Sequence, residues 1–377
     1  MKKSISLFLV MCVLATLTSC GSENKVSSVP VSTMVISPVE TMPEPFRTDS
    51  EKSELTTDVI TPPEKETFNI KLSFAGDVLL AAFMDETKLY NFNDFVSKNP
   101  PTYFLEKVRH VFDADDFTVV NLENVFTDRD LLPIEKDHDP AYWYKSKTSN
   151  VEILTSSGVD GVSLVNNHMD DYGAEGFEDT YNTVKGAGLY AGTADEVMYL
   201  EKEGFTVAVI CTGLWSVYQA NSVQIRLDAA KENSDYQIIF FHGGTEMIHE
   251  PEQWKIDACR KLVDGGADLV IGSHPHILQP MENYNGVDII YSLGNFCFGD
   301  WYRPENRTII YQMDLTIDRE TMVVKDEVSK IIPCYVHTGE TRNNYQPAVI
   351  ENEDEINRVM SFMRWECDSP VAEEQSE

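Results

Sequence analysis

The chain has 377 residues, 42% of them hydrophobic, so it is long enough to form a folded domain with a large core. It carries 62 acidic and 30 basic residues, which gives a formal net charge of −32. Because nucleic-acid binding requires clustered Lys and Arg, this balance argues against a nucleic-acid partner and favours a well-solvated surface.

The N-terminal residues predict export from the cytoplasm. Residues 1–19 begin with Lys2 and Lys3 and continue with an apolar run that is too short for a comfortable transmembrane helix and is typical of a signal peptide. The small residues before Cys20 resemble the bacterial lipoprotein box, which implies cleavage before Cys20 and lipidation of its thiol. A plain secretory signal with an incidental Cys is the alternative. We expect the mature chain at the extracytoplasmic face of the bacterial cell membrane, held by a lipid anchor.

Composition divides the rest of the chain into three parts. Residues 20–67 are rich in Ser, Thr, Pro and Glu, which predicts a disordered tether that begins at the lipidated Cys. Apolar patterns over residues 68–340 predict a folded domain. Residues 341–377 predict a C-terminal helix and an acidic tail.

The cysteines that follow the tether are scattered: Cys211, Cys259, Cys297, Cys334 and Cys367. They show no CxxC spacing, which argues against a disulfide framework or a zinc knuckle. We expect most of them to be small buried hydrophobic residues, and the sequence leaves open whether two of them form a disulfide.

Strand-like and helix-like segments alternate along the predicted domain. Segments with alternating or β-branched residues predict strands at 68–77, 116–124, 159–168, 205–213, 236–244, 267–276 and 287–296. Helical patterns lie between several of them, at 102–113, 174–188 and 253–266. Residues 308–332 predict a hairpin, and residues 355–365 predict a final helix. This order predicts a layered α/β domain.

Most of the predicted strands end in polar or ionisable residues. The residues at these ends are Asp77, Glu123, Asn167, His168, His242, His274 and His276. In α/β sheets, ligands gather at the carboxyl ends of the strands, so we expect these side chains on one rim. Each has an ordinary explanation alone, as a turn-forming Asp or a core His. The repetition at several strand ends favours a site.

Carboxylate, amide and imidazole groups together form the ligand set of a hydrolytic site that holds Zn, Mn or Fe. In VIGSHPHILQP, His274 and His276 flank Pro275, which restricts the backbone between them. On an extended chain both side chains point to one side, whereas on a tight loop they can straddle two metals. Two ions about 3.5–4 Å apart can generate a hydroxide nucleophile.

Six segments in this order resemble the CapA family of capsule-synthesis proteins, also called PgsA proteins, which are associated with poly-γ-glutamate: FAGDVLL, VVNLENVFT, LVNNHMDDYG, FFHGGTE, IGSHPHILQP and YSLGNF. The resemblance covers roughly residues 68–335. The family is related to the calcineurin-like metallophosphatases. This relation implies an α/β fold built as a four-layer αββα metallophosphatase-like sandwich, in which two sheets pack face to face and helices lie outside.

The resemblance implies roles for individual residues. The residues that match metal ligands are Asp77, Glu123, Asn167, His242, His274 and His276. His168 matches the catalytic histidine that follows the amide ligand. Glu246 in HGGTE is expected to act as a general acid or base, or to hold a ligating His.

Two further residues carry open alternatives. Asp171 matches the family's D-x-G pattern, which implies a contact with substrate, but an acid there also suits the start of the following helix. Asn295 in SLGNF is either substrate-facing or part of a tight turn that favours Gly and Asn.

The sequence departs from the superfamily pattern at two positions. The first superfamily motif is D-x-H, but Asp77 is followed by Val78 and Leu79, so one ligand of the first metal is absent. Glu123 stands where the superfamily has a bridging Asp. One tightly bound divalent metal and two ions in altered geometry both fit this pattern.

Three functions remain open at this point. The first is a lipid-anchored protein of poly-γ-glutamate or capsule synthesis, export or processing, acting by metal-assisted hydrolysis or transfer. The second is a secreted metallophosphoesterase that acts on nucleotides or phosphorylated glycans. The third is a non-catalytic assembly factor that binds the polymer. The expected partners are an anionic cell-surface polymer, the membrane through the lipid, and other capsule-synthesis membrane proteins.

Overall fold

The computed structural model describes residues 66–82, 91–137, 141–299, 305–340 and 342–372. The chain divides into Met1–Pro62 and a compact unit, Pro63–Glu377, which contains all of the described residues. The predicted signal peptide, the lipidation site Cys20 and nearly all of the tether lie outside the described residues. Within the described ranges, no helix combines the length and the apolar character that crossing a membrane requires.

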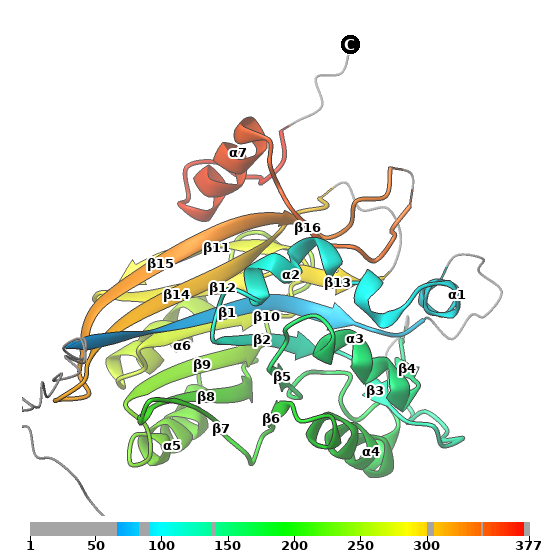
Figure 1. The fold of residues 1–377 in the computed structure, drawn as a ribbon, viewed down its shortest axis with the longest axis horizontal. Coiled ribbons are helices and arrows are strands. Elements are labelled where there is room, and N and C mark those ends of the chain that lie inside the picture. Colours follow the sequence, from blue (N-terminus) through cyan, green and yellow to red (C-terminus); the bar gives the residue numbers. More distant parts are fainter. Residues whose placement is uncertain (1–65, 83–90, 138–140, 300–304, 341, 373–377) are drawn as a thin grey trace, which may run out of the picture. The chain divides into compact units, whose positions relative to one another are not determined.

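The first sheet has the strand order β16-β15-β14-β1-β2-β5-β6, and β13 pairs with β1 beyond this path (Figure 1). Its strands are β1 (Thr67–Leu79), β2 (Phe117–Leu122), β5 (Gly161–Ser163), β6 (Tyr190–Gly192), β13 (Asn295–Phe298), β14 (Thr308–Asp318), β15 (Val324–Tyr335) and β16 (Ala348–Val349). Strand β1 runs parallel to β2 and antiparallel to β14. The predicted hairpin over 308–332 is therefore the β14–β15 pair.

The second sheet has the strand order β11-β12-β10-β9-β8-β7. Its strands are β7 (Met198–Lys202), β8 (Phe205–Gly213), β9 (Tyr236–His242), β10 (Leu269–Ser273), β11 (Leu278–Tyr284) and β12 (Val287–Leu293). The four strands β8, β9, β10 and β12 are parallel, and the outer strands β7 and β11 are antiparallel to their neighbours. A short separate pair is formed by β3 (Val125–Phe126) and β4 (Lys145–Ser146).

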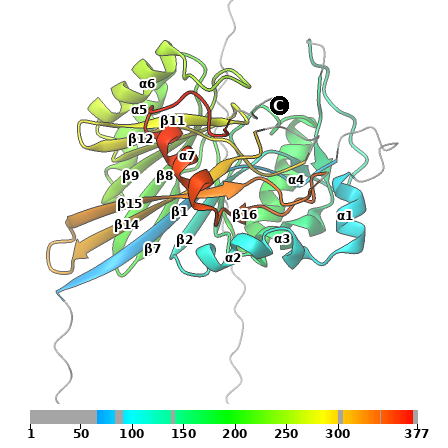
Figure 2. The ribbon, with the colours of Figure 1, turned by 90° about the horizontal axis from the view of Figure 1, so that it is seen from above.

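The helices connect the strands or flank the sheets. They are α1 (Phe92–Lys98), α2 (Glu106–Phe112), α3 (Glu152–Thr155), α4 (Gly173–Gly186), α5 (Ala220–Ala230), α6 (Gln253–Asp264) and α7 (Glu353–Met363). Two 3₁₀ turns, η1 (Pro101–Tyr103) and η2 (Thr148–Val151), precede α2 and α3. Figure 2 shows α5 and α6 beside β8 and β9, and α1, α3 and α4 on the side of the first sheet.

The two sheets pack face to face through a buried apolar layer. Phe74 of β1 and Phe240 of β9 meet edge to face with ring centroids 5.9 Å apart. Alternate residues of β8 divide between two layers, because successive side chains of a strand point to opposite faces. Val209 lies in the layer between the sheets, whereas Ile210 lies in the layer beneath α5 and α6. Both faces of β8 are therefore covered, which explains its nearly continuous apolar sequence.

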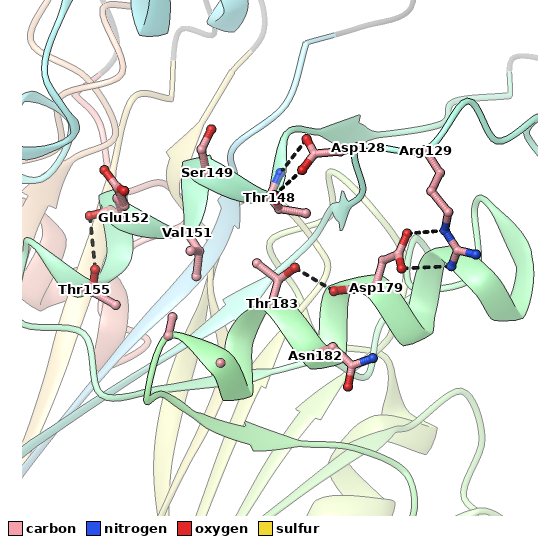
Figure 3. Close-up of a pocket in the computed structure, with 12 residues that line it drawn as sticks. Asp128, Arg129, Thr148, Ser149, Val151, Glu152, Thr155, Asp179, Asn182 and Thr183 are labelled. Carbon is pink, nitrogen blue, oxygen red and sulfur yellow. Dashed lines mark hydrogen bonds and ion pairs between the residues drawn. The ribbon is translucent and has the colours of Figure 1, made fainter.

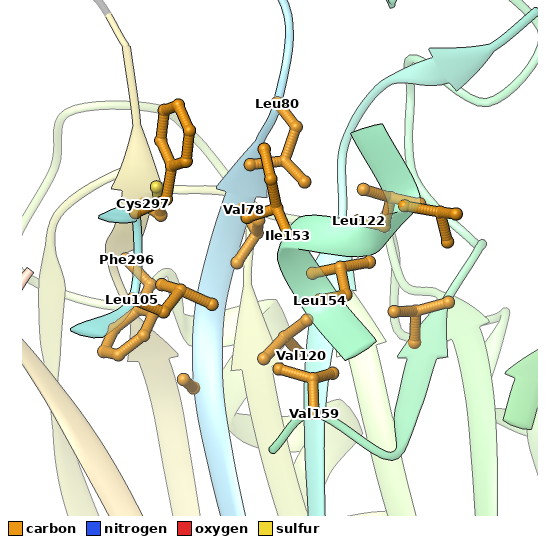
Figure 4. Close-up of a cluster of buried hydrophobic side chains, with 14 of the residues drawn as sticks. Val78, Leu80, Leu105, Val120, Leu122, Ile153, Leu154, Val159, Phe296 and Cys297 are labelled. Carbon is orange, nitrogen blue, oxygen red and sulfur yellow. The ribbon is translucent and has the colours of Figure 1, made fainter. Parts of the chain in front are cut away.

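The outer face of the first sheet is covered by helices. Val120 of β2 lies in one buried cluster with Leu105, which precedes α2, and with Leu154 of α3 (Figure 4). Each fully buried Leu or Val of this kind contributes about 1.5–3 kcal/mol by leaving water. Helices thus cover the outer face of each sheet, and the predicted four-layer αββα sandwich is confirmed. The described cysteines are free thiols, and all but Cys367 are buried.

The packing brings several strand ends to one edge. Asp77 at the end of β1 pairs in register with Asn121 of β2. In the second sheet, Gly213, His242 and Ser273 are in register at the ends of β8, β9 and β10. The polar residues that follow these strands therefore meet at the edge that the two sheets share.

Candidate metal centre

Asp77 forms the base of the site, where β1 changes register with its neighbours. Its side chain is fully buried. Asn121 donates a hydrogen bond to Asp77 Oδ1 at 2.8 Å, and the backbone N–H of His274 donates to Oδ2 at 3.2 Å. The preceding position must be glycine, because a Cβ on residue Gly76 would lie 1.8 Å from the carbonyl oxygen of Gly294. This packing fixes the carboxylate at the edge of both sheets.

Glu123 lies at the centre of the site. Its side chain is fully buried, and neither carboxylate oxygen has a hydrogen-bond partner. Glu123 Oε1 lies 3.8 Å from His242 Nε2, 3.9 Å from His276 Nε2 and 4.0 Å from His168 Nε2. Burial, and then the charge of Asp77, raise the pKa of Glu123 well above its usual value. A buried carboxylate without a partner is energetically unfavourable, so a cation beside it fits this position.

Two further ligand atoms converge on His242, which ends β9. His242 Nε2 lies 2.7 Å from Asn167 Oδ1 and 3.0 Å from His274 Nδ1. Burial lowers the pKa of His242 well below its usual value, and burial followed by the charge of His276 lowers the pKa of His274 to about 3. Neutral imidazoles keep the lone pair that a metal ion requires.

The donor atoms form three overlapping groups, each with all atoms within 4.8 Å of one another: Glu123 with His242 and His274; Asp77 with Glu123 and His276; and Glu246 with His274 and His276. Mixed imidazole, carboxylate and amide donors suit Zn, Mn or Fe. With the unpaired carboxylate of Glu123, this donor set fits a divalent metal.

The His274–Pro275–His276 turn explains how His274 joins the group with His242, His276 joins the group with Asp77, and both join the group with Glu246. Strand β10 ends at Ser273, and His274 and His276 have φ values of 98° and 61°, in the left-handed region that non-glycine residues rarely adopt. Of the two geometries that the sequence allows, the structure has the tight loop. Such strain persists where surrounding contacts hold it, and it is concentrated at functional sites.

His276 and Asp77 form an ion pair. His276 Nδ1 lies 3.5 Å from Asp77 Oδ2. Burial opposes the charge on His276, but Glu123 and Asp77 outweigh burial and raise its pKa to about 9. Burial likewise acts against ionised Asp77, yet His276 and His242 lower its pKa to about 2. The imidazolium of His276 and the carboxylate of Asp77 therefore stabilise each other's charged form.

His168 is oriented by a residue behind it. His168 Nδ1 lies 2.9 Å from Asp171 Oδ2, so Nε2 is directed to the side of Glu123. Asp171 is fully buried and also accepts hydrogen bonds from Lys136 Nζ and from the backbone N–H of Tyr144. Asp171 thus has its direct contacts with His168, Lys136 and Tyr144, and its predicted contact with substrate stays a prediction. Lys136 was missed by the sequence analysis, because it lies in an irregular segment with no motif.

Glu246 and Asn295 lie on opposite sides of His276. Glu246 Oε1 is 4.0 Å from His276 Nε2, and the Glu246 side chain is 55% exposed, so it stands at the open side of the site. Asn295 Oδ1 is 2.8 Å from His276 Nδ1, and Asn295 is buried. The direct contact of Asn295 is therefore with a candidate ligand, and its substrate role stays a prediction.

Two amides beneath the site were not predicted as site residues. Asn166 donates to Asn121 Oδ1 and to the carbonyl oxygen of Leu122, and its own Oδ1 accepts from the backbone N–H of His168. These bonds tie β2 to the loop after β5 that carries Asn167. The signal was present in the motifs NLEN and VNNH, where both amides lie beside candidate ligands.

A separate hollow of about 730 Å³ lies between η2, α3 and α4 (Figure 3). None of its lining residues belongs to the metal-ligand groups. In its wall, Arg129 pairs with Asp179 and the Thr148 hydroxyl donates to Asp128, as Figure 3 shows. We therefore assign the chemistry to the histidine cluster and not to this hollow.

Residues 71–300 match the family described as bacterial capsule synthesis protein PGA_cap, which is more than half of the chain. The chain belongs to this family. All of the candidate metal ligands lie within the PGA_cap match.

Curated relatives carry related names. The PGA biosynthesis protein CapA of Bacillus subtilis is 27% identical over 270 residues, which cover 65% of this chain and 70% of that protein. The capsule biosynthesis protein CapA of Bacillus anthracis is 26% identical over 272 residues, covering 65% of this chain and 64% of that protein. A probable polyglutamine synthesis accessory protein of Mycobacterium tuberculosis is 25% identical over 215 residues, covering 48% and 55%.

Two solved structures of bacterial proteins align with this chain. A hypothetical protein of Thermus thermophilus aligns with a TM-score of 0.43 at 13% identity, covering 70% of this chain and 99% of that one. A novel phosphatase of Mycoplasma pneumoniae aligns with a TM-score of 0.41 at 13% identity, covering 74% and 96%.

Proposed function

We propose that this PGA_cap protein acts on poly-γ-glutamate in the synthesis, export or processing of a capsule, through a divalent metal centre. The observation that carries the proposal is the fully buried Glu123, whose unpaired carboxylate is surrounded by three imidazoles. The names of the Bacillus relatives support the choice of polymer.

The metal ligands that we propose are Asp77, Glu123, Asn167, His242, His274 and His276. When bound, a divalent ion at such a site supplies Lewis acidity and a water of lowered pKa. Glu246 stands at the open side, where it can contact a group that enters the site.

The reaction that we propose is hydrolysis of the γ-amide, or its transfer to another amine. In hydrolysis the carbonyl carbon gains the oxygen of water and the C–N bond breaks. The leaving nitrogen takes up a proton, and the products are a carboxylate and an amine. His168 is suited to hold and deliver that proton, because Asp171 fixes its Nδ1 and leaves Nε2 turned to the site.

We also propose that the protein is held at the extracytoplasmic face of the membrane by a lipid on Cys20, where it meets other capsule-synthesis membrane proteins. The apolar run that precedes Cys20 and the tether that follows it support this location. Metabolic labelling with a tagged fatty acid tests the anchor: Cys20→Ala should abolish labelling and release the protein from membranes. Retention of the label would contradict the proposal.

The residues around Asp77 favour a metallophosphoesterase less than a protein that acts on poly-γ-glutamate. The superfamily pattern has a His two residues after this Asp, and Leu79 stands there. Leu79 is completely buried in a small apolar cluster with Ala81, Tyr144 and Phe298, so that position offers no metal ligand. Hydrolysis of phosphoesters by the metal-loaded protein, with no action on poly-γ-glutamate, would reverse this preference.

Elemental analysis of the full chain after loading with Mn, Zn or Fe tests the metal centre first. We expect one or two equivalents in the wild type and a loss of metal in the double variant His274→Ala, His276→Ala. The matched control is His110→Ala, an exposed histidine on α2, which should bind as the wild type does. Cleavage of poly-γ-glutamate is then followed in the same proteins. Absence of metal from the loaded wild type would favour a non-catalytic assembly factor.

A further inference from the structure

An exposed tryptophan stands against the ligand cluster. Trp215 follows β8, and its ring meets that of His274 edge to face at 4.7 Å and that of His242 at 6.1 Å. The residue is nevertheless 41% exposed, so part of the ring faces the medium beside the site. Burial of a tryptophan is strongly favourable, so an exposed ring that touches two candidate ligands is not explained by core packing.

The loops after β8 and β9 hold Trp215 in place. The backbone N–H of Leu214 donates to the carbonyl oxygen of His242 at 3.0 Å. A Cβ on Gly243 would lie 1.9 Å from the carbonyl oxygen of Leu214, so glycine is needed for this close approach. The backbone N–H of Trp215 donates to Gln219 Oε1. The backbone that carries the indole is therefore fixed beside the histidines.

Met247 provides a second exposed apolar side chain next to the ligand turn. It is 50% exposed, and its φ is 60°, a left-handed conformation that costs an L-residue energy. Its backbone N–H donates to the carbonyl oxygen of Pro275 at 2.9 Å, which ties it to the residue between His274 and His276. Trp215 contacts one end of this turn and Met247 its middle.

Two lysines near the centre are already engaged. Lys136 donates to Asp171 and to the carbonyl oxygen of Tyr142. Lys255 is fully buried and donates to Gln279 Oε1 at 2.9 Å, with its ammonium directly behind Gly244. An anionic ligand that enters here would meet the metal ion, the carboxylate of Glu246 and the apolar side chains of Trp215 and Met247, and neither of these ammonium groups.

We propose that Trp215 and Met247 form a substrate subsite that packs against the methylene stem of a γ-linked glutamate unit whose free α-carboxylate is bound at the metal centre. This inference rests on the proposed function and specifies how the polymer is held. A γ-linked unit has two consecutive methylenes and a planar amide in its backbone, and both pack well against an indole face and a thioether. Two methylenes removed from water correspond to roughly tenfold in affinity.

The test uses the full chain loaded with Zn²⁺ and two probes of equal charge. One probe is a γ-linked oligoglutamate, and the other is an α-linked oligoaspartate with one methylene per residue. We expect Trp215→Ala to weaken binding of the oligoglutamate about tenfold, to change oligoaspartate binding little and to leave the zinc content unchanged. Trp215→Phe should keep most of the affinity. Tyr199→Ala, an exposed aromatic on β7, is the matched control.

The indole also gives a direct signal. Addition of the oligoglutamate should change the tryptophan fluorescence of the wild type but not of Trp215→Phe. Equal oligoglutamate affinities for Trp215→Ala and the wild type would overturn the subsite and leave the proposed function standing. Loss of zinc from Trp215→Ala would also overturn it, because the ring would then serve only to support His274. If the zinc-loaded wild type bound no oligoglutamate, the proposed function would fail together with the subsite.

Discussion

Asn295 fixes the orientation of His276. Asn295 Oδ1 lies 2.8 Å from His276 Nδ1, and on the other side of the ring His276 Nε2 lies 3.9 Å from Glu123 Oε1. The amide oxygen accepts from Nδ1–H, so Nε2 is the nitrogen that faces the centre of the site. Partners of this kind fix the tautomer and the ring orientation of ligating histidines in metal sites.

Loss of the contact between Asn295 and His276 is expected to weaken metal binding. Asn295→Ala should lower metal affinity about 10- to 100-fold, because His276 then loses the group that orients its ring. The affinity is measured by competition with a chromophoric chelator. Asn343→Ala, which removes an amide that donates to the carbonyl oxygen of Phe298, is the control. Unchanged affinity in Asn295→Ala would show that Asp77 alone orients His276.

Removal of the charge of Glu123 should have opposite effects on the two forms of the protein. Without metal, Glu123→Gln should raise stability near pH 7 by about 1 kcal/mol or more, because burial raises the pKa of Glu123 and the wild type must take up a proton or bury a charge on folding. With metal, the same change should reduce the rise in melting temperature that binding causes, because stabilisation by a ligand follows its affinity. Thermal unfolding with and without Zn²⁺ or Mn²⁺ measures both effects. A metal-free variant less stable than the wild type would contradict the expectation.

The local sequence predicted the strands that carry the site better than the elements around them. FTVAVICTG and YQIIFFH have continuous apolar runs because helices and the other sheet cover both faces, and both form strands where predicted. The strand predicted at 159–168 is shorter, because β5 ends at Ser163 and the chain then turns to present Asn167 and His168. The polar residues after Ser163 belong to the loop that carries the site residues and do not continue the strand.

Elements without a regular pattern were missed. Helix α5 was not predicted, since Ile225 is 72% exposed and interrupts the apolar stripe of that helix. Strand β11 was not predicted as a separate strand, because its first residues lie in the motif that contains His276. The candidate ligands themselves were found from motifs, but their grouping depends on contacts between residues far apart in sequence. The bond between Lys136 and Asp171 could not be predicted for the same reason, because the two residues are distant in sequence and no motif links them.

Asp115 makes the stability of the folded state depend on pH, independently of the metal site. Thr118 donates to Asp115 Oδ2 at 2.7 Å, whereas the buried Oδ1 has no hydrogen-bond partner. Burial, aided by the charges of Asp160 and Asp116, raises the pKa of Asp115 from 3.8 to about 6. The folded state therefore prefers the protonated acid. Its contribution to stability is fully present below about pH 4 and is lost as the pH rises through about 6.

Asp115→Asn should remove this dependence, because the amide stays neutral. Relative to the wild type, the variant should gain about 1–2 kcal/mol between pH 4 and pH 7, allowing for the partial exposure of the side chain. Chemical denaturation of both proteins at each pH measures the difference, and titration of the histidine cluster cancels in it. A difference that is constant across this range would mean that Asp115 titrates at its ordinary pKa.

Gly76 is expected to be indispensable to both the fold and the metal centre. An added Cβ would meet the carbonyl oxygen of Gly294 at 1.8 Å, and that oxygen accepts the backbone N–H of Asp77. Gly76→Ala should therefore destabilise the protein by about 3 kcal/mol or more and displace Asp77, with loss of bound metal. The matched control is Gly186→Ala at the end of α4, where nothing lies within 4 Å and helix propensity predicts a gain of about 0.5 kcal/mol. Denaturant unfolding and elemental analysis test the pair. Gly76→Ala with wild-type stability and metal content would show that β1 and the Gly294 turn separate easily.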